Sequence, residues 1–495
     1  MHYNITNIIL NHGFDYKNKE ESIYINLYRS IQKAIMNRKF EDGFKLPPSR
    51  ILAKDLSISR NTVVKAYDLL VLENYINSRQ GSGYFVSPVE NKKNQFKFNK
   101  SIKKKGYPET SYRAKSFSNN LQKNESDNKI VFRPGLPPLD IFPVQTWKNL
   151  SNKYWKTISG SKLSYSSCFG LKCLRQSISN YLKVYRNTNC HIDQIIITTG
   201  TLHSLSLISD ALLNEGDEII LENATYPNAL SLFKSLKPKI ILAETDSEGI
   251  VINKVKCKKP KFVYTTPSNQ YPTGIKMSLE RRIKLLKWAS DQKTMLIEDD
   301  YDHEFINWSN PISSIFSLDN EDRTVYLGTF NKLLHPSIRI GYMIVPSFLK
   351  NSIRGLYEKS SRFVSPSTQT ILSYFIDKDY LNKHLRKVVE IASERKIFFK
   401  KYFESIFGNK IELDTTNSGL HLIGKLKPHI NDVELSKHFR DKGVIVNPYS
   451  NYFIDNKNIN GLVIGYASVD KKIIKQTILK MYDEYINFLN IKDHS

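Results

Sequence analysis

Lys332 ends the run Gly328-Thr-Phe-Asn-Lys, and a strand is expected directly before it at residues 324–327. A lysine amine can form a Schiff base with a carbonyl compound. Arg339 follows shortly after, and its guanidinium suits a phosphate group. Because lysine is abundant in this chain, the meaning of Lys332 depends on which other groups the fold places beside it.

Acidic residues end the preceding apolar strand, expected at residues 294–297. In Ile297-Glu-Asp-Asp-Tyr301 they place Asp299 at the carboxyl edge of a parallel sheet, where ligands bind. Tyr301 could donate a hydrogen bond to a ring hydroxyl. Capping of the next helix by these acids is the alternative, and this segment alone does not decide between the two.

A glycine turn supplies the third piece. Gly200 lies in Thr199-Gly-Thr201, after the strand expected at residues 195–198 and at the start of a helical stretch, so its backbone N–H groups can hold a phosphate. Such a turn is common and is weak evidence by itself. Pyridoxal phosphate, however, requires a lysine, an acid for its ring nitrogen, a stacking ring and phosphate donors. The sequence therefore predicts a site for this cofactor.

The N-terminal part predicts three helices and a hairpin. Apolar residues recur every fourth position from Ile23 to Ile35, a second helix should follow Pro48, and a third should begin at Ser59. Two extended pieces flank Gly81-Ser-Gly83. This order is helix, helix-turn-helix, then hairpin.

Short polar and basic side chains gather at the start of the third helix, whose opposite face is apolar. A helix-turn-helix inserts this part of its second helix into the major groove, while a basic hairpin can enter the neighbouring minor groove. Each such residue by itself is more often a solvated surface group. The candidates for contact with double-stranded operator DNA are Arg50, Ser59, Arg60, Asn61, Thr62, Lys65, Arg79, Gly81 and Gly83.

Composition limits the classes of partner. The formal net charge of +25 attracts polyanions, although charge alone does not choose among nucleic acid, acidic membranes and phosphorylated ligands, or mere solubility. The four cysteines form no CxxC pair, which favours a reducing cytoplasmic compartment and no metal site. No apolar run approaches the roughly 18 residues of a membrane span. We expect a cytoplasmic protein without a membrane partner.

Three regions follow from these patterns. Residues 20–89 should form the DNA-binding domain, and residues 90–129 a basic, flexible linker without regular periodicity. Residues 130–495 alternate helical stretches with short apolar strands, which indicates a parallel α/β sheet.

Both halves resemble known families. Leu46-Pro-Pro-Ser-Arg50, the run from Leu56 to Tyr67, and Arg79-Gln-Gly-Ser-Gly-Tyr-Phe-Val86 closely resemble the GntR-type winged helix. The lysine, acid and glycine motifs resemble fold-type I aminotransferases, and together the halves resemble the MocR family over essentially the whole chain. The resemblance implies an α+β winged helix-turn-helix, an α/β aminotransferase-like domain with a mostly parallel sheet, and a head-to-tail homodimer.

The same resemblance assigns roles within the cofactor site. Lys332 would form the internal aldimine, Asp299 would pair with the pyridinium nitrogen, Tyr301 would contact the ring oxygen, and Tyr226 would stack on the ring. The phosphate would be surrounded by Gly200, Thr201, Thr329 and Arg339, with Tyr165 reaching the phosphate of the partner subunit.

Two departures bear on activity. Tyr271 stands where aminotransferases place an asparagine that contacts the cofactor ring, and Asn269 is a possible substitute. Aminotransferases also anchor the substrate carboxylate with an arginine near the C-terminus, but this chain has none after Arg440. Transamination of an ordinary α-amino acid is therefore disfavoured.

The leading hypothesis is a transcription regulator that resembles the PdxR branch, with pyridoxal phosphate itself as effector and the genes of vitamin B6 synthesis as targets. An amino-acid- or amine-responsive regulator is the main rival. A working aminotransferase that carries a DNA-binding module is the third hypothesis.

Overall fold

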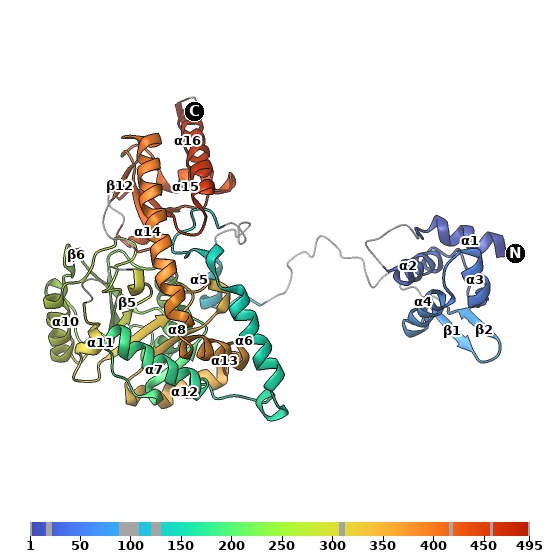
Figure 1. Ribbon diagram of the computed structural model, residues 1–495, viewed down its shortest axis with the longest axis horizontal. Coiled ribbons are helices and arrows are strands. Elements are labelled where there is room, and N and C mark those ends of the chain that lie inside the picture. The colour runs from blue at the N-terminus through green and yellow to red at the C-terminus, as the bar shows by residue number, and fades with distance from the viewer. Residues whose placement is uncertain are drawn as a thin grey trace. The chain divides into compact units, whose positions relative to one another are not determined.

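The computed structural model of the protein describes residues 2–15, 22–88, 108–119, 130–305, 312–414, 419–455 and 459–493. The chain divides into two units, residues 1–108 and 109–495, and each has its own hydrophobic core. Figure 1 labels the elements of both units. Both expected fold classes are confirmed: a winged helix in the first unit and an aminotransferase-type α/β fold in the second.

The first unit is a helical cluster followed by a two-stranded hairpin. Leu27, Ile31 and Ile35 are fully or almost fully buried, so the predicted apolar stripe does face the core. Sequence analysis did not predict the first helix, which buries Ile5 and Ile9 in the same core. The elements are α1 (His2–Asn11), α2 (Ile23–Met36), α3 (Ser49–Asp55), α4 (Arg60–Leu72), β1 (Ile76–Arg79) and β2 (Gly83–Val86).

The second unit is built on a seven-stranded sheet with the strand order β3-β11-β10-β9-β8-β4-β5. Strand β11 runs antiparallel to its two neighbours, and the other neighbouring pairs are parallel. Most of these strands are buried on both faces, which explains their continuous apolar runs. The strands are β3 (Ile195–Thr198), β4 (Glu218–Glu222), β5 (Lys239–Ala243), β8 (Phe262–Thr265), β9 (Met295–Asp299), β10 (Thr324–Thr329) and β11 (Gly341–Ile344).

Helices cover both faces of this sheet. Separate apolar clusters lie on the two sides, one around Ile197 and Tyr326 and another around Ile196 and Leu327, as the alternation of side chains along a strand requires. The helices are α6 (Val144–Thr157), α7 (Lys172–Arg186), α8 (Thr201–Leu212), α9 (Pro227–Lys234), α10 (Leu279–Gln292), α11 (Ile315–Leu318), α12 (Lys350–Ser360) and α13 (Pro366–Asp377), and a small ribbon pairs β6 (Thr245–Asp246) with β7 (Gly249–Ile250).

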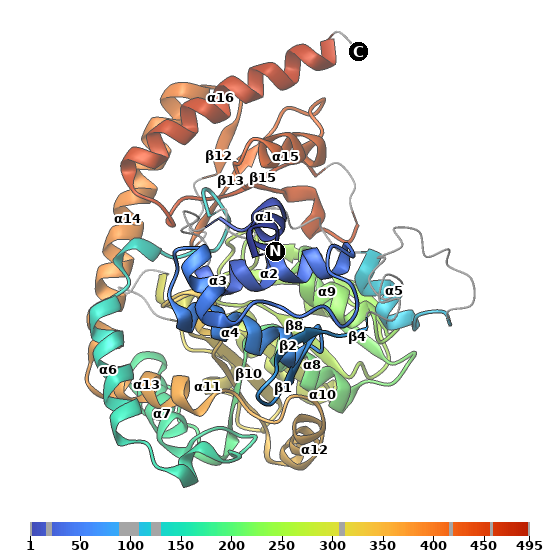
Figure 2. The ribbon, with the colours of Figure 1, turned by 90° about the vertical axis from the view of Figure 1, so that its right-hand side faces the viewer.

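A smaller sheet with the order β12-β13-β15-β14 forms the C-terminal part of this unit. Figure 2 shows the long helix α14 running from the neighbourhood of α13 to this part, where it packs against α16. Its core is rich in aromatic rings from both helices. The elements are α14 (Tyr380–Phe407), β12 (Glu412–Asp414), β13 (His421–Lys425), α15 (Asp432–Asp441), β14 (Asn447–Pro448), β15 (Gly461–Gly465) and α16 (Lys471–Asp493).

One finding differs from the expectation of an unstructured linker at residues 90–129. Helix α5 (Tyr112–Asn119) forms within it and packs against α9 of the second unit. Its sequence carries no strong apolar stripe, and tertiary contacts provide the stability that its composition lacks. Residues 90–107 and 120–129 lie outside the described residues.

Candidate functional site

A cavity of about 220 Å³ opens at the carboxyl ends of the parallel strands of the large sheet. Eight of the ten predicted cofactor residues line it, and Tyr165 and Asn269 do not. Because these residues come from loops that follow β3, β4, β8, β9 and β10, the sheet brings together groups far apart in sequence. The lining consists of Gly200, Thr201, Leu202, Tyr226, Tyr264, Thr266, Tyr271, Asp299, Tyr301, Thr329, Asn331, Lys332, Pro336 and Arg339.

Lys332 extends from the loop after β10 toward a glycine that sequence analysis missed. Its Nζ donates a hydrogen bond to the carbonyl oxygen of Gly135 at 2.7 Å. Gly135 has a φ of +73°, and a Cβ at this position would come within 2.5 Å of the lysine Nζ. Burial lowers the pKa of Lys332, against the opposing effect of Asp302 and Asp299. A lowered pKa increases the neutral, nucleophilic fraction of the amine.

Asp299 presents a carboxylate oxygen that has no partner. Its Oδ2 accepts a hydrogen bond from the hydroxyl of Tyr264 at 2.8 Å, whereas its Oδ1 is buried without a hydrogen bond in the described residues. Burial raises the pKa of Asp299 to about 7. A protonated ring nitrogen in the cavity would satisfy the free oxygen and favour the ionised form.

The acids on either side of Asp299 belong to the framework. Glu298 accepts hydrogen bonds from the backbone N–H groups of Ile315 and Phe316 at 3.0 and 2.8 Å, and so caps α11. Successive side chains of a strand point to opposite faces, so Asp299 alone faces the cavity. Helix capping, the alternative interpretation of this segment, therefore holds for Glu298, whereas Asp299 faces the cavity.

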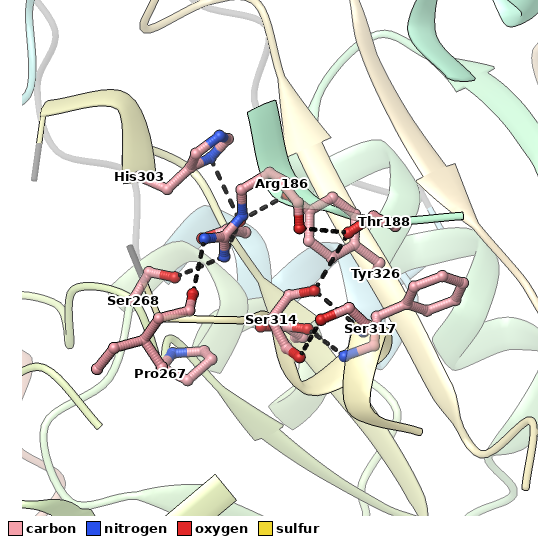
Figure 3. A network of polar contacts seen from close by, with 12 residues as sticks. Arg186, Thr188, Pro267, Ser268, His303, Ser314, Ser317 and Tyr326 are labelled. Atoms are coloured by element: carbon pink, nitrogen blue, oxygen red, sulfur yellow. Dashed lines mark hydrogen bonds and ion pairs between the residues drawn. The ribbon is translucent and has the colours of Figure 1, made fainter. Parts of the chain in front are cut away.

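A buried polar network holds the carboxyl end of β9 in place. Figure 3 shows Arg186 at its centre, and its guanidinium pairs with Asp300 at 2.7 Å and donates to the hydroxyl of Ser268 at 3.0 Å. The hydroxyl of Tyr326 donates to Asp300 at 2.6 Å. Burial alone would raise the pKa of Asp300, but Arg186 and His303 outweigh it and hold this pKa below its usual value. The network keeps β9 and the loop after it in one arrangement.

The opposite end of the cavity suits a phosphate. Gly200 has a φ of +132° and precedes α8, whose first residue is Thr201. A Cβ on Gly341 would lie 2.8 Å from the Cα of Gly200, so only glycine allows this close approach. Arg339 lines the same wall, and its guanidinium has no ion pair or hydrogen bond within the described part of the chain. The hydroxyl of Thr329, which accepts from the N–H of Asn331 at 3.2 Å, completes this end.

Aromatic rings close the remaining side. The ring centroid of Tyr271 lies 6.1 Å from that of Tyr226 and 5.6 Å from that of Tyr301. The hydroxyl of Tyr301 donates to the carbonyl oxygen of Asn269 at 3.1 Å, while the amide of Asn269 donates to Asp302 at 2.7 Å. Asn269 thus does not line the cavity, whereas Tyr271 does.

The C-terminal sheet provides no arginine beside this aromatic wall. Strand β15 is apolar and fully buried, and its Val463 is paired with Ile423 and Asn447 of the neighbouring strands. His421 lies on the same face of β13 as Ile423, because the two are separated by one residue. Burial lowers the pKa of His421 to about 4, so the ring is neutral at pH 7.

Tyr165 lies elsewhere on the surface of this unit. Its side chain is 79% exposed, and the guanidinium carbon of Arg362 lies 5.1 Å from its ring centroid. Within the described residues of the single chain, Tyr165 is not part of the cavity lining.

The predicted DNA-contact residues lie in the first unit, mostly on its surface. Arg50, Arg60, Asn61 and Lys65 are exposed. Ser59 is exposed as well, and its hydroxyl accepts from the N–H of Thr62 at 3.1 Å and so caps α4.

The hairpin presents the remaining candidates. Gly81 and Gly83 both have positive φ, and the guanidinium of Arg79 stacks over Phe85 at 4.6 Å from the ring centroid. This stacking holds a cation at the edge of the wing.

Comparison with known proteins agrees with this architecture. Residues 128–476 match the family model of aminotransferase class I and II, and residues 23–86 match that of the bacterial regulatory proteins of the gntR family. The probable rhizopine catabolism regulatory protein MocR of Rhizobium meliloti is 28% identical, over 93% of each chain. The HTH-type pyridoxine biosynthesis transcriptional regulator PdxR of Corynebacterium glutamicum is 26% identical, over 93% of this chain and 96% of its own.

Among solved structures, a kynurenine aminotransferase of Pyrococcus horikoshii superposes with a TM-score of 0.66 at 25% identity, over 81% of this chain and 99% of its own.

This chain belongs to the MocR family of GntR-type transcription regulators. Its large unit is accordingly an aminotransferase-like domain, and its small unit is a DNA-binding winged helix.

Pyridoxal phosphate is the cofactor of this fold, and the cavity of the MocR-family chain fits it. The cofactor supplies an aldehyde that condenses with a primary amine. Lys332 would provide that amine, the free Oδ1 of Asp299 would meet the ring nitrogen, and Arg339 with the start of α8 would hold the phosphate. No helix in the described ranges is long and apolar enough to cross a membrane.

Proposed function

We propose that this MocR-family regulator binds operator DNA through its winged helix and that pyridoxal phosphate is itself the effector. Binding of the cofactor in the large unit then changes the affinity of the chain for its operator. The regulated genes would be those of vitamin B6 synthesis, because the PdxR relative is a regulator of pyridoxine biosynthesis.

One contrast within the cavity carries this proposal. The cofactor end has a lysine, an unpartnered carboxylate oxygen and a guanidinium without an ion pair. Behind the cavity wall, the neutral ring of His421 packs on the lining residue Tyr271, with the ring centroids 5.2 Å apart, and the neighbouring strand carries apolar Val463. A substrate carboxylate would need a cation there. The described site is thus better equipped for the cofactor than for an α-amino acid.

The test begins with the DNA sequences that the protein itself prefers. Duplexes selected by the full chain from a random-sequence pool are used to measure affinity with pyridoxal phosphate, with each common amino acid, and with neither. We expect that pyridoxal phosphate changes the affinity for these duplexes and that the amino acids do not. If only an amino acid alters it, the proposal is wrong.

Lys332 is tested in the same assay. Lys332→Ala should abolish the covalent attachment that borohydride reduction and mass spectrometry detect, together with the response of DNA affinity to pyridoxal phosphate. Lys332→Arg is the matched variant, since it keeps the positive charge but cannot condense with an aldehyde. Retained attachment in either variant would show that another lysine is used.

The main rival, a regulator that responds to an amino acid or amine, has one specific candidate residue. Arg133 lies two residues before Gly135 and is half-buried, so it is positioned in the chain segment that touches Lys332. Loss of an amino-acid response in Arg133→Ala would favour this rival. Production of a keto acid at a useful rate would instead support a working aminotransferase.

A head-to-tail homodimer is part of the same proposal. Tyr165 is strongly exposed in the single chain, as expected of a side chain that reaches the phosphate of a second subunit. Sedimentation measures the oligomeric state, and Tyr165→Phe should weaken pyridoxal-phosphate binding without changing that state. Unchanged binding would leave Tyr165 without this role.

A further inference from the structure

Helix α5 lies between the two regions that match family models, residues 23–86 and 128–476. It belongs to the second unit and packs against α9, as Figure 2 shows. The chain is therefore anchored to the second unit before the region that matches the aminotransferase model begins at residue 128.

Two polar contacts fasten this helix. The guanidinium of Arg113 lies 3.5 Å from a carboxylate oxygen of Asp210 on α8, and Asp210 also accepts from the hydroxyl of Ser206 at 3.3 Å. The Nζ of Lys237, which follows α9, lies 4.9 Å from the ring centroid of Tyr112. Thus α5 is attached near the C-terminal ends of both α8 and α9.

The other ends of these two helices form walls of the cofactor cavity. Helix α8 begins at Thr201, beside the proposed phosphate position, and α9 begins directly after Tyr226, the proposed stacking ring. The two helices also pack against each other. Helices α8 and α9 therefore form a contiguous, rigid connection between the cavity and the surface that holds α5.

The ion pair between Arg113 and Asp210 adds only weakly to the docking of α5. Arg113 and Asp210 are 41% and 27% exposed at their side chains, and such ion pairs contribute little. A helix of eight residues is not stable alone in water, so release from this surface also means loss of the helix. An element balanced in this way responds to a small difference in ligand affinity between its two states.

We propose that α5 is the element that reports cofactor binding to the linker. Occupation of the cavity stabilises the docked helix and so keeps the chain anchored to the second unit from Tyr112 onward. Loss of the cofactor releases the helix from α9, so that the chain is no longer anchored at this point. This inference rests on the proposed function and assigns the regulation of the same site.

Hydrogen exchange of the full-length protein tests it. Amides of residues 112–119 should exchange several-fold more slowly with pyridoxal phosphate than without. Arg113→Ala should accelerate their exchange about twofold to fivefold and reduce the effect of pyridoxal phosphate on affinity for the selected duplex. Lys115→Ala is the matched control, because it removes a charge from the same helix, and among the described residues Lys115 forms an ion pair only with Glu109, at 2.6 Å.

A charge exchange provides the rescue. The double variant Arg113→Asp with Asp210→Arg should restore slow exchange and the ligand response, whereas each single variant should lose both. If pyridoxal phosphate attaches to Lys332 and alters DNA affinity while the exchange of α5 is unchanged, the proposed function stands and this inference is overturned. If pyridoxal phosphate does not alter DNA affinity at all, both are overturned.

Discussion

Residues around Lys332 show which parts of a site local sequence can reveal. The strand ends that carry Asp299, Thr329 and Lys332 were predicted because each follows an apolar run, and all three line the cavity. Gly135 was missed because its contact with Lys332 joins residues 197 positions apart. No local pattern contains that pairing, and only the fold creates it.

Removal of the unpaired guanidinium should weaken cofactor binding strongly. In Arg339→Ala the phosphate loses a charge-assisted hydrogen bond of about 1.5–3 kcal/mol, which corresponds to roughly tenfold to 100-fold in affinity. Titration of the visible absorption with pyridoxal phosphate measures this loss. Arg323→Ala is the control, since Arg323 pairs with Glu321 at 2.8 Å and lies outside the cavity. Equal affinity in the two variants would exclude Arg339 from the phosphate site.

Asp299 should make the ligand-free protein less stable as pH rises. Its pKa is raised to about 7 by burial, whereas in the unfolded chain it is about 4. The unfolded chain ionises first, so the stability contributed by the protonated carboxyl is present below about pH 4 and lost as pH rises through about 7. Between about pH 4 and pH 7, the temperature of thermal unfolding should fall more steeply with pH in the wild type than in Asp299→Asn. If the unfolding temperature depends on pH equally in both proteins, the pKa of Asp299 is not raised.

Elements that are long or continuously apolar could be predicted from sequence. The strand expected at residues 195–198 coincides with β3. The strand expected at residues 324–327 is β10, which continues for two more residues to Thr329. Helices α1 and α5 were missed because both derive their stability from packing on neighbours rather than from a strong pattern of their own. Strand β14 could not be predicted because its two residues are too few to show any periodicity.

Helix α4 allows its cap and its proposed DNA-reading residue to be separated. Ser59→Ala removes the hydroxyl that accepts from Thr62 and should cost the winged helix about 1 kcal/mol, measured by calorimetry of the full chain. Ser59→Asn should retain the cap. Arg60→Ala, in contrast, should weaken binding to the selected duplex with little effect on stability, because Arg60 is exposed. If Arg60→Ala binds that duplex normally, α4 is not the reading helix that we propose.

At the scale of the whole molecule, the question is whether the two units communicate. Neither the winged-helix motifs nor the cofactor motifs contain information on this coupling, because each set specifies only its own unit. The strong positive charge of the chain favours binding to any DNA and therefore does not measure regulation either. Only a dependence of one binding event on the other distinguishes an effector from a resident cofactor.

Thermodynamic linkage makes this distinction measurable from either side. If pyridoxal phosphate changes operator affinity by a given factor, the selected duplex must change the affinity for pyridoxal phosphate by the same factor. We expect a factor of about 5 to 150, the usual range for coupled sites. Titrations of pyridoxal phosphate with and without saturating duplex give the number, and a scrambled duplex of the same length controls for charge. Identical titrations would mean that the cofactor is a fixed part of the large unit, because an effector cannot act on DNA binding without being affected by it.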